Sequence, residues 1–239
     1  MDNPQSGELT FGAGLFSVFL CIVFGANAVA IKFSVAGLGP FTAAGLRFCI
    51  ASVVICLWAR ITGRSFHLKK GQLKKLLIIT VVFTCQLSFF YLGISKTYAS
   101  RATLIVNLLP FFVLIMAHFF LRGDRITVRK LSGVLLGFSG VALIFLQKEG
   151  VTSELKTGDF MVFAAALIWS CNSIYTKRII HEFEAFHIVW YPMVFSIPLF
   201  LTEALLFDRP MIGNVDSTIV WAMAYQGFIT ASFGFVAWN

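Results

Sequence analysis

Long stretches without a charged side chain dominate this sequence. Seven of them contain no Asp, Glu, Lys or Arg, and an eighth carries only Arg47. A helix needs about 20 apolar residues to cross a hydrocarbon core roughly 30 Å thick. We therefore predict an all-α, polytopic membrane bundle with eight spans: 10–31, 41–59, 76–95, 102–121, 131–147, 160–176, 185–202 and 217–239.

Composition excludes a soluble alternative. The mean hydropathy is +0.85 and charged residues make up 13% of the chain. Too few polar side chains remain to cover the water-facing sides of the helices in a soluble protein of 239 residues.

The positive charges indicate the orientation of the chain. The net charge is +8, but the cations lie between spans, so no nucleic-acid partner is needed to explain it. With the N-terminus in the cytoplasm, twelve Lys and Arg fall on the cytoplasmic side and six on the other, with the densest group between Arg60 and Lys75. The positive-inside rule then predicts this orientation, with the N-terminus in the cytoplasm. Because residues 1–10 hold Asp2 and Glu8 and no cation, a cleavable signal peptide is not expected.

Two segments 145 residues apart resemble each other. Residues 24–32 and 169–177 each contain an aromatic residue, an Asn three positions later, and a Lys five positions after the Asn. A unit of five spans would place its second copy in the opposite orientation, as in transporters built from inverted repeats. We predict a first repeat at 1–147 and a second at 156–239. The second has counterparts of only three spans, and we expect a C-terminal truncation.

Three segments together resemble the EamA-type family of the drug/metabolite transporter superfamily. They are 24–32 with Pro40-Phe41 and 44–48, then 91–140 with Asn107-Leu-Leu-Pro110 and Asp124 where the family usually has Glu, and finally 169–177. The resemblance implies ten helices in two inverted five-helix repeats, of which eight are present here. It also implies transport of amino acids or other small metabolites, often outward, across the cytoplasmic membrane.

Polar side chains inside apolar spans are the candidate site residues. Asn27 and Asn172 are costly there without partners, so they either face a substrate path or join helices. Lys32 and Lys177 lie roughly 140° around the helix from these asparagines at about 100° per residue, and we expect them to extend to the membrane interface.

Arg47 is the sharpest candidate, because a cation inside a span must pair with something other than lipid. Its partner is either a substrate carboxylate or a polar group of the bundle. Gln86, Tyr91, Asn107 and Trp169 add amide and aromatic groups suited to a small amphipathic substrate.

Other features receive structural predictions. Pro110, Pro192 and Pro198 can kink their spans. The basic cluster 69–75 should contact anionic lipid. The cysteines lack metal-site spacing and should pack as small apolar residues, so neither a metal site nor a cofactor is predicted.

Proton coupling has few candidate groups. Asp159 begins one predicted span, Glu203 follows another and His118 lies near a cytoplasmic end. From their positions we expect little support for a carboxylate-driven proton cycle through these helices.

Three functions remain to be compared. Catalysis is disfavoured because no paired mid-span acids, His-Glu-x-x-His or Gly-x-Ser-x-Gly are present. The leading hypothesis is a permease that exports or exchanges a small-molecule substrate, and a homodimer is compatible with it. The alternative is a lipid or glycolipid flippase, for which Arg47 and Lys32 could bind headgroups.

Overall fold

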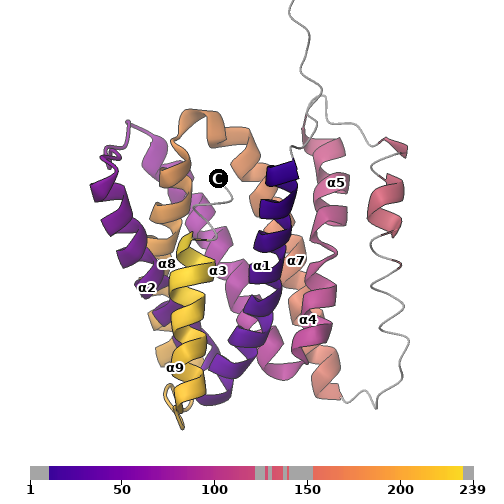
Figure 1. Cartoon of the computed structure of the whole chain (residues 1–239), viewed down its shortest axis with the longest axis vertical. Coiled ribbons are helices and arrows are strands. Elements are labelled where there is room, and N and C mark those ends of the chain that lie inside the picture. Colours follow the sequence, from indigo (N-terminus) through magenta and orange to yellow (C-terminus); the bar gives the residue numbers. More distant parts are fainter. Residues whose placement is uncertain (1–10, 122–126, 129–130, 137–138, 140–152, 234–239) are drawn as a thin grey trace, which may run out of the picture.

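The computed structural model describes residues 11–121, 127–128, 131–136, 139 and 153–233, and these form a bundle of helices (Figure 1). Within those residues the only β pairing is an isolated bridge between Leu38 and Ile212. The elements are α1 (Phe11–Gly37), α2 (Pro40–Ile61), α3 (Gln72–Lys96), α4 (Ala99–Val106), α5 (Leu109–Phe120), α7 (Ser153–Ile179), η1 (Ile180–Glu182), α8 (Ala185–Phe207), α9 (Ser217–Ala224) and η2 (Tyr225–Phe233).

Six of the described segments are long and apolar enough to cross a membrane: 14–37, 40–61, 72–96, 99–120, 153–182 and 185–207. The prediction of a polytopic helical membrane protein is therefore confirmed. Several helices are longer than predicted, since α1 continues from 31 to Gly37 and α8 from 202 to Phe207. Most of the predicted span 131–147 lies outside the described residues, and 217–239 is described only to 233.

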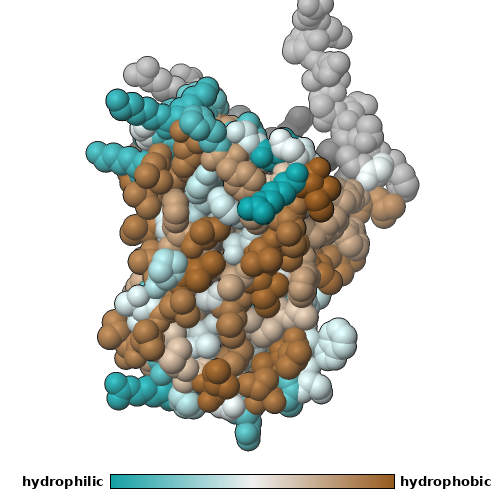
Figure 2. All heavy atoms as spheres, turned by 90° about the vertical axis from the view of Figure 1, so that its left-hand side faces the viewer, coloured by the Kyte–Doolittle hydropathy of each residue, from teal (hydrophilic) through white to brown (hydrophobic). Residues whose placement is uncertain are grey.

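The outer surface matches a lipid environment. Figure 2 shows apolar side chains over the middle of one face and hydrophilic ones gathered at its two ends. Large apolar residues such as Val53, Val81 and Leu205 are more than half exposed. Cys21, Cys49 and Cys171 are exposed too, so the predicted packing of these three inside the bundle is wrong.

Helix α3 lies against α7 along most of its length, and α2 lies against α8. Small residues permit the closest crossing. A Cβ added at Gly93 of α3 would come within 2.9 Å of the Gly158 carbonyl oxygen on α7. Phe48 of α2 stacks on Phe200 of α8, with ring centroids 5.7 Å apart, in the centre of the largest apolar cluster.

The prolines have different effects. Pro110 follows a break in the helix at residues 107–108, where α4 ends and α5 begins. A proline has no N–H to continue the helical hydrogen bonds, which explains the break. Pro192 and Pro198 lie within an uninterrupted α8, so a hinge at either remains a prediction.

The loop between α2 and α3 is fastened to the start of α8. His187 Nε2 lies 2.7 Å from the Ser65 carbonyl oxygen, and Tyr191 donates to the Phe66 carbonyl at 2.6 Å. The Phe66 ring packs edge-on against Trp190. We call this end of the bundle the basic end, because the loop carries Arg64 and the cluster 69–75, and the end where α1 meets α2 the opposite end.

Candidate functional site

Arg47 lies in the interior of the bundle, with only 4% of its surface exposed. Its Nη1 donates to the Tyr91 hydroxyl on α3 and its Nη2 donates to the Thr230 hydroxyl on η2, both at 3.3 Å. The side chain therefore connects α2 to two further helices that are far apart in the sequence.

These contacts extend into a larger group of hydrogen bonds. Tyr91 donates to Gln226 Oε1 at 3.0 Å, and Gln226 Nε2 donates to the Ser34 hydroxyl at 2.6 Å. Thr230 donates to Asn27 Oδ1 at 2.9 Å. We call Asn27, Ser34, Arg47, Tyr91, Gln226 and Thr230 the Arg47 network; it joins α1, α2, α3 and η2.

The Arg47 network has an unusual charge balance. Among the described residues, the hydrogen-bond partners of Arg47 are two neutral hydroxyls, and its Nε has no partner. The guanidinium also lies 5.3 Å from the centroid of the Phe48 ring, where a cation–π attraction is favourable. Burying a cation is costly without an opposite charge, so this position is suited to an incoming anion.

The local backbone also distinguishes this region. Gln226 and Thr230 lie on η2, a π-helix that continues directly from α9. π-helical segments are rare and occur frequently at functional sites. Gly227 permits close packing there, since an added Cβ would meet the Ile50 side chain on α2 at 2.6 Å.

A second polar contact joins α3 and α7. Asn172 Nδ2 donates to Gln86 Oε1 at 3.3 Å, and both residues are buried. Asn172 Oδ1 has no partner among the described residues. A substrate N–H group or a water molecule could satisfy this oxygen.

The structure thus brings most predicted site residues into two groups. Asn27, Arg47 and Tyr91 belong to the Arg47 network, whereas Gln86 and Asn172 pair with each other. The other two predicted residues lie outside both groups: Asn107 is exposed at the break between α4 and α5, and Trp169 is half-buried on α7.

Sequence reasoning missed Gln226, Thr230 and Ser34. Gln226 is fully buried and makes hydrogen bonds to two other helices. The sequence could have identified Gln226 as a candidate, because it is an amide inside the apolar stretch 217–239. Hydroxyl side chains such as Thr230 and Ser34 are frequent in membrane helices and gave no comparable signal.

Lys32 binds the end of α3. Its Nζ donates to the carbonyl oxygens of Ile94, Ser95 and Thr97 at 2.9, 3.0 and 2.7 Å. Helix α1 continues past Lys32 to Gly37, and a position of its ammonium group at the membrane interface stays a prediction. Lys177, in contrast, is exposed near the end of α7.

Asp159 is held by neighbouring residues at the opposite end. It forms an ion pair with Arg101 and accepts a hydrogen bond from Thr97 at 2.6 Å. These contacts tie the start of α7 to α4 and to the end of α3. Asp159 therefore has a structural role in this conformation.

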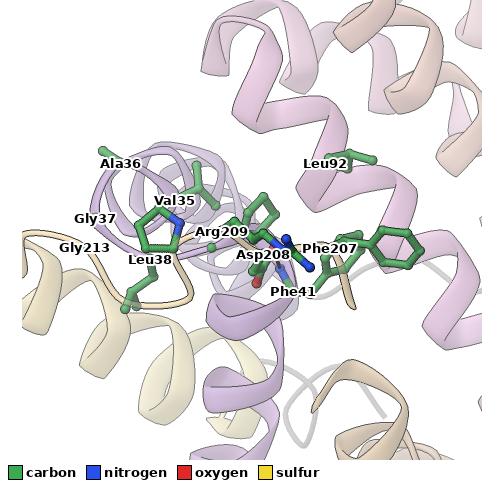
Figure 3. A pocket seen from close by; sticks show the side chains of 13 residues that line it. Val35, Ala36, Gly37, Leu38, Phe41, Leu92, Phe207, Asp208, Arg209 and Gly213 are labelled. Carbon is green, nitrogen blue, oxygen red and sulfur yellow. Dashed lines mark hydrogen bonds between the residues drawn. The ribbon is translucent and has the colours of Figure 1, made fainter. Parts of the chain in front are cut away.

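A cavity of about 600 Å³ opens at the opposite end, between the α1–α2 turn, α3 and the segment after α8. Figure 3 shows Phe41, Leu92, Phe207 and Asp208 around it. Asp208 also fixes the start of α2, accepting from Thr42 N at 2.7 Å and Thr42 Oγ1 at 2.8 Å. The cavity does not include Arg47, and among the described residues no cluster of His, Cys, Asp and Glu could hold a metal ion.

Two relatives of this chain are named as a transporter and as an efflux pump. It is 25% identical to the "Uncharacterized transporter YoaV" of Bacillus subtilis, over 94% of this chain and 77% of that protein. It is 24% identical to an Escherichia coli protein named "Probable amino-acid metabolite efflux pump", over 95% of this chain and 76% of that protein.

The fold has been seen before in a crystal structure described without a functional name. It superimposes with a TM-score of 0.75, covering 94% of this chain and 76% of that chain at 20% identity. The profile of the EamA-like transporter family matches residues 12–146 and 156–239, so the chain belongs to the EamA-like transporter family.

Proposed function

We propose that this protein moves small carboxylate-bearing metabolites, amino acids foremost, across the cytoplasmic membrane and predominantly outward. The observation that carries the proposal is Arg47, a buried guanidinium with two neutral hydroxyl partners and an unpaired Nε. A carboxylate matches the planar, multi-donor guanidinium better than a neutral group does. Substrate binding would supply the missing negative charge.

Polar groups elsewhere in the bundle could accept hydrogen bonds from the rest of an amino acid. Asn27, Gln226 and the unpartnered Asn172 Oδ1 offer carbonyl oxygens that could accept from a substrate ammonium group. In the present conformation Asn27 Oδ1 accepts from Thr230 and Gln226 Oε1 accepts from Tyr91. Substrate entry would therefore exchange internal hydrogen bonds for bonds to the substrate. The name of the Escherichia coli relative supports amino-acid metabolites as the first class to test.

Helix packing supports movement of two halves around this site. Helix α3 lies against α7 and α8, and reciprocally α9 and η2 lie against α1 and α2. The two repeated asparagines show the same reciprocal pattern. Asn27 on α1 is hydrogen-bonded to η2, and Asn172 on α7 is hydrogen-bonded to α3. This reciprocity is what inverted repeats at 1–147 and 156–239 would produce, and rocking of one against the other would give alternating access.

Charge distribution supports a cytoplasmic N-terminus. Lys69, Lys70 and Lys74 are exposed at the basic end. Cytoplasmic loops carry an excess of such residues. With this orientation, the cavity beside Asp208 faces the exterior.

The test is counterflow in liposomes containing the purified protein, with labelled L-phenylalanine and, in parallel, phenethylamine, which lacks the carboxylate. We expect exchange of the amino acid only, and a loss of at least about tenfold in Arg47→Lys, because a lysine cannot replace a forked guanidinium. Equal transport of both compounds, or an unchanged Arg47→Lys variant, would contradict the carboxylate role of Arg47.

The flippase alternative is measured in the same vesicles. A fluorescent phospholipid in the inner leaflet becomes accessible to an external quencher only if lipid crosses the bilayer. Lipid movement without flux from a wider panel of labelled metabolites would replace the transport proposal with the flippase. Arg64→Gln, an exposed change at the basic end, serves as the matched control for loss of an arginine.

A further inference from the structure

An acidic side chain lies inside α8 and faces α3. Glu203 is half-buried, and its Oε2 lies 2.6 Å from the Ser88 hydroxyl oxygen. The sequence suggested a position beyond the span, but α8 continues to Phe207, one helical turn further. A carboxyl group at such a site is costly when ionised, so its protonation state matters for the bundle.

The hydrogen bonds around Ser88 define two protonation states. The Ser88 oxygen also lies 2.9 Å from the Thr84 carbonyl oxygen, yet a hydroxyl has a single proton to donate. When Ser88 donates to Thr84, the contact with Glu203 is a hydrogen bond only if the carboxyl group is protonated and donates to Ser88. When Glu203 is ionised, Ser88 must turn and donate to it instead.

The cavity at the opposite end lies close to this pair. Leu92 of α3 and Phe207 of α8 line the cavity. Ser88 and Glu203 each lie four residues earlier in the direction of the membrane interior, on the same faces of their helices. The Glu203–Ser88 pair is therefore one turn beneath the cavity wall.

Other charged or titratable groups lie on the elements near the pair. Asp208, at the end of α8, and Cys85, on α3, both interact electrostatically with Glu203. Helix α2 contributes Arg47, which is bonded to Tyr91 and Thr230. Arg209 lies in the cavity lining.

We propose that Glu203 is a proton-binding site that exchanges with the cavity and couples proton movement to substrate transport. A proton from water bonds to a Glu203 carboxylate oxygen, and the Ser88 hydroxyl then turns from Glu203 to the Thr84 carbonyl. Release of the proton reverses both changes. Since α3 belongs to the proposed first repeat and α8 to the proposed second, ionisation alters a contact that would shift when the two repeats move.

The coupling step rests on the proposed transport function, so proton binding is measured separately. Infrared difference spectra of the reconstituted protein are recorded while the pH is lowered. We expect a carboxylic-acid C=O band that is missing in Glu203→Gln and shifted in Ser88→Ala, which removes its hydrogen-bond partner. An identical band set in wild type and Glu203→Gln would overturn the proton site whether or not transport is observed.

Transport then tests the coupling. In Glu203→Gln we expect counterflow of L-phenylalanine to persist while the response to an imposed pH gradient is lost. Glu184→Gln, at an exposed residue, should keep both the counterflow of L-phenylalanine and the response to the pH gradient. If Glu203→Gln responds to the gradient as wild type does, proton coupling through Glu203 is refuted. Loss of counterflow together with a lower melting temperature would assign Glu203 a structural role and likewise refute it.

Discussion

The ammonium group of Lys32 lies 2.7 Å from the carbonyl oxygen of Thr97, at the end of α3. Two further carbonyls, of Ile94 and Ser95, accept from the same Nζ. The last carbonyls of a helix have no partner within it and carry partial negative charge, so a lysine there supplies both hydrogen bonds and favourable electrostatics. Lys32 therefore fastens α1 to the end of α3.

Replacing Lys32 with Met should lower stability without greatly changing side-chain length. Hydrogen bonds to a charged group contribute about 1.5–3 kcal/mol each, and water can recover part of this at a half-buried site. We expect a net loss of about 2 kcal/mol, which corresponds to roughly 4–8 °C in melting temperature for a chain of this size. Thermal unfolding in detergent, followed by intrinsic fluorescence, measures the change.

Lys74→Met is the matched control, because Lys74 is exposed and lies on the first turn of α3. Its melting temperature should stay within about 1–2 °C of wild type, as is usual for surface substitutions. Equal losses in the two variants would mean that the carbonyl contacts of Lys32 add nothing.

Much of the fold could be predicted because crossing a membrane imposes a simple requirement on sequence. Apolar stretches with no charge or only one indicated α2 and α3 to within a few residues at each end. Helix ends were harder to predict, because α1 and α8 continue past polar residues that form hydrogen bonds within the bundle. Lys32 and Glu203 were placed near or beyond helix ends for this reason.

The candidate site was only partly predictable. Arg47 and Asn27 stand out as polar groups in apolar stretches, which was enough to identify them as candidates. Their partners depend on three-dimensional packing, because Thr230 is 203 residues from Asn27. Asn107 gave the same kind of signal as Asn27 but lies exposed where α4 ends. Sequence alone does not distinguish an amide facing the interior from one that ends a helix.

Tyr91→Phe tests whether the hydroxyl inside the Arg47 network holds it together. The change leaves Gln226 Oε1 and Arg47 Nη1 without the partner they share. A buried polar group left unsatisfied costs about 1–3 kcal/mol, so we expect a lower melting temperature and a changed KM for the transported amino acid. Tyr98→Phe, at a residue 51% exposed, should leave both values unchanged. A Tyr91→Phe variant identical to wild type would show that the hydroxyl is dispensable.

Labelling of introduced cysteines tests the proposed orientation. Lys74 lies at the basic end, and Val215 lies at the opposite end, close to where Gly213 N donates to the Gly37 carbonyl. In a variant without the five native cysteines, we expect Lys74→Cys to react with a membrane-impermeant maleimide only in inside-out vesicles. Val215→Cys should react only in right-side-out vesicles. The reverse pattern would place the N-terminus outside, and reaction of both from one side would contradict the arrangement of the spans.

The crossing of α3 and α7 at Gly93 should tolerate no side chain. An added Cβ would come within 2.7 Å of Val162 Cγ2 and within 2.9 Å of both Gly158 O and Val162 N. Overpacking of this kind typically costs about 1–3 kcal/mol, so Gly93→Ala should lower the melting temperature by several degrees. Gly25→Ala is the control, because nothing described lies within 4 Å of its added Cβ.

A second substitution identifies which atoms cause the loss. Val162→Ala removes the clashing methyl group, but the backbone atoms at 2.9 Å remain. Backbone cannot move away without separating the helices, so the double variant Gly93→Ala/Val162→Ala should stay less stable than Val162→Ala alone. A double variant as stable as Val162→Ala would mean that only the valine side chain limits the crossing. Helices α3 and α7 would then be free to separate slightly where they cross.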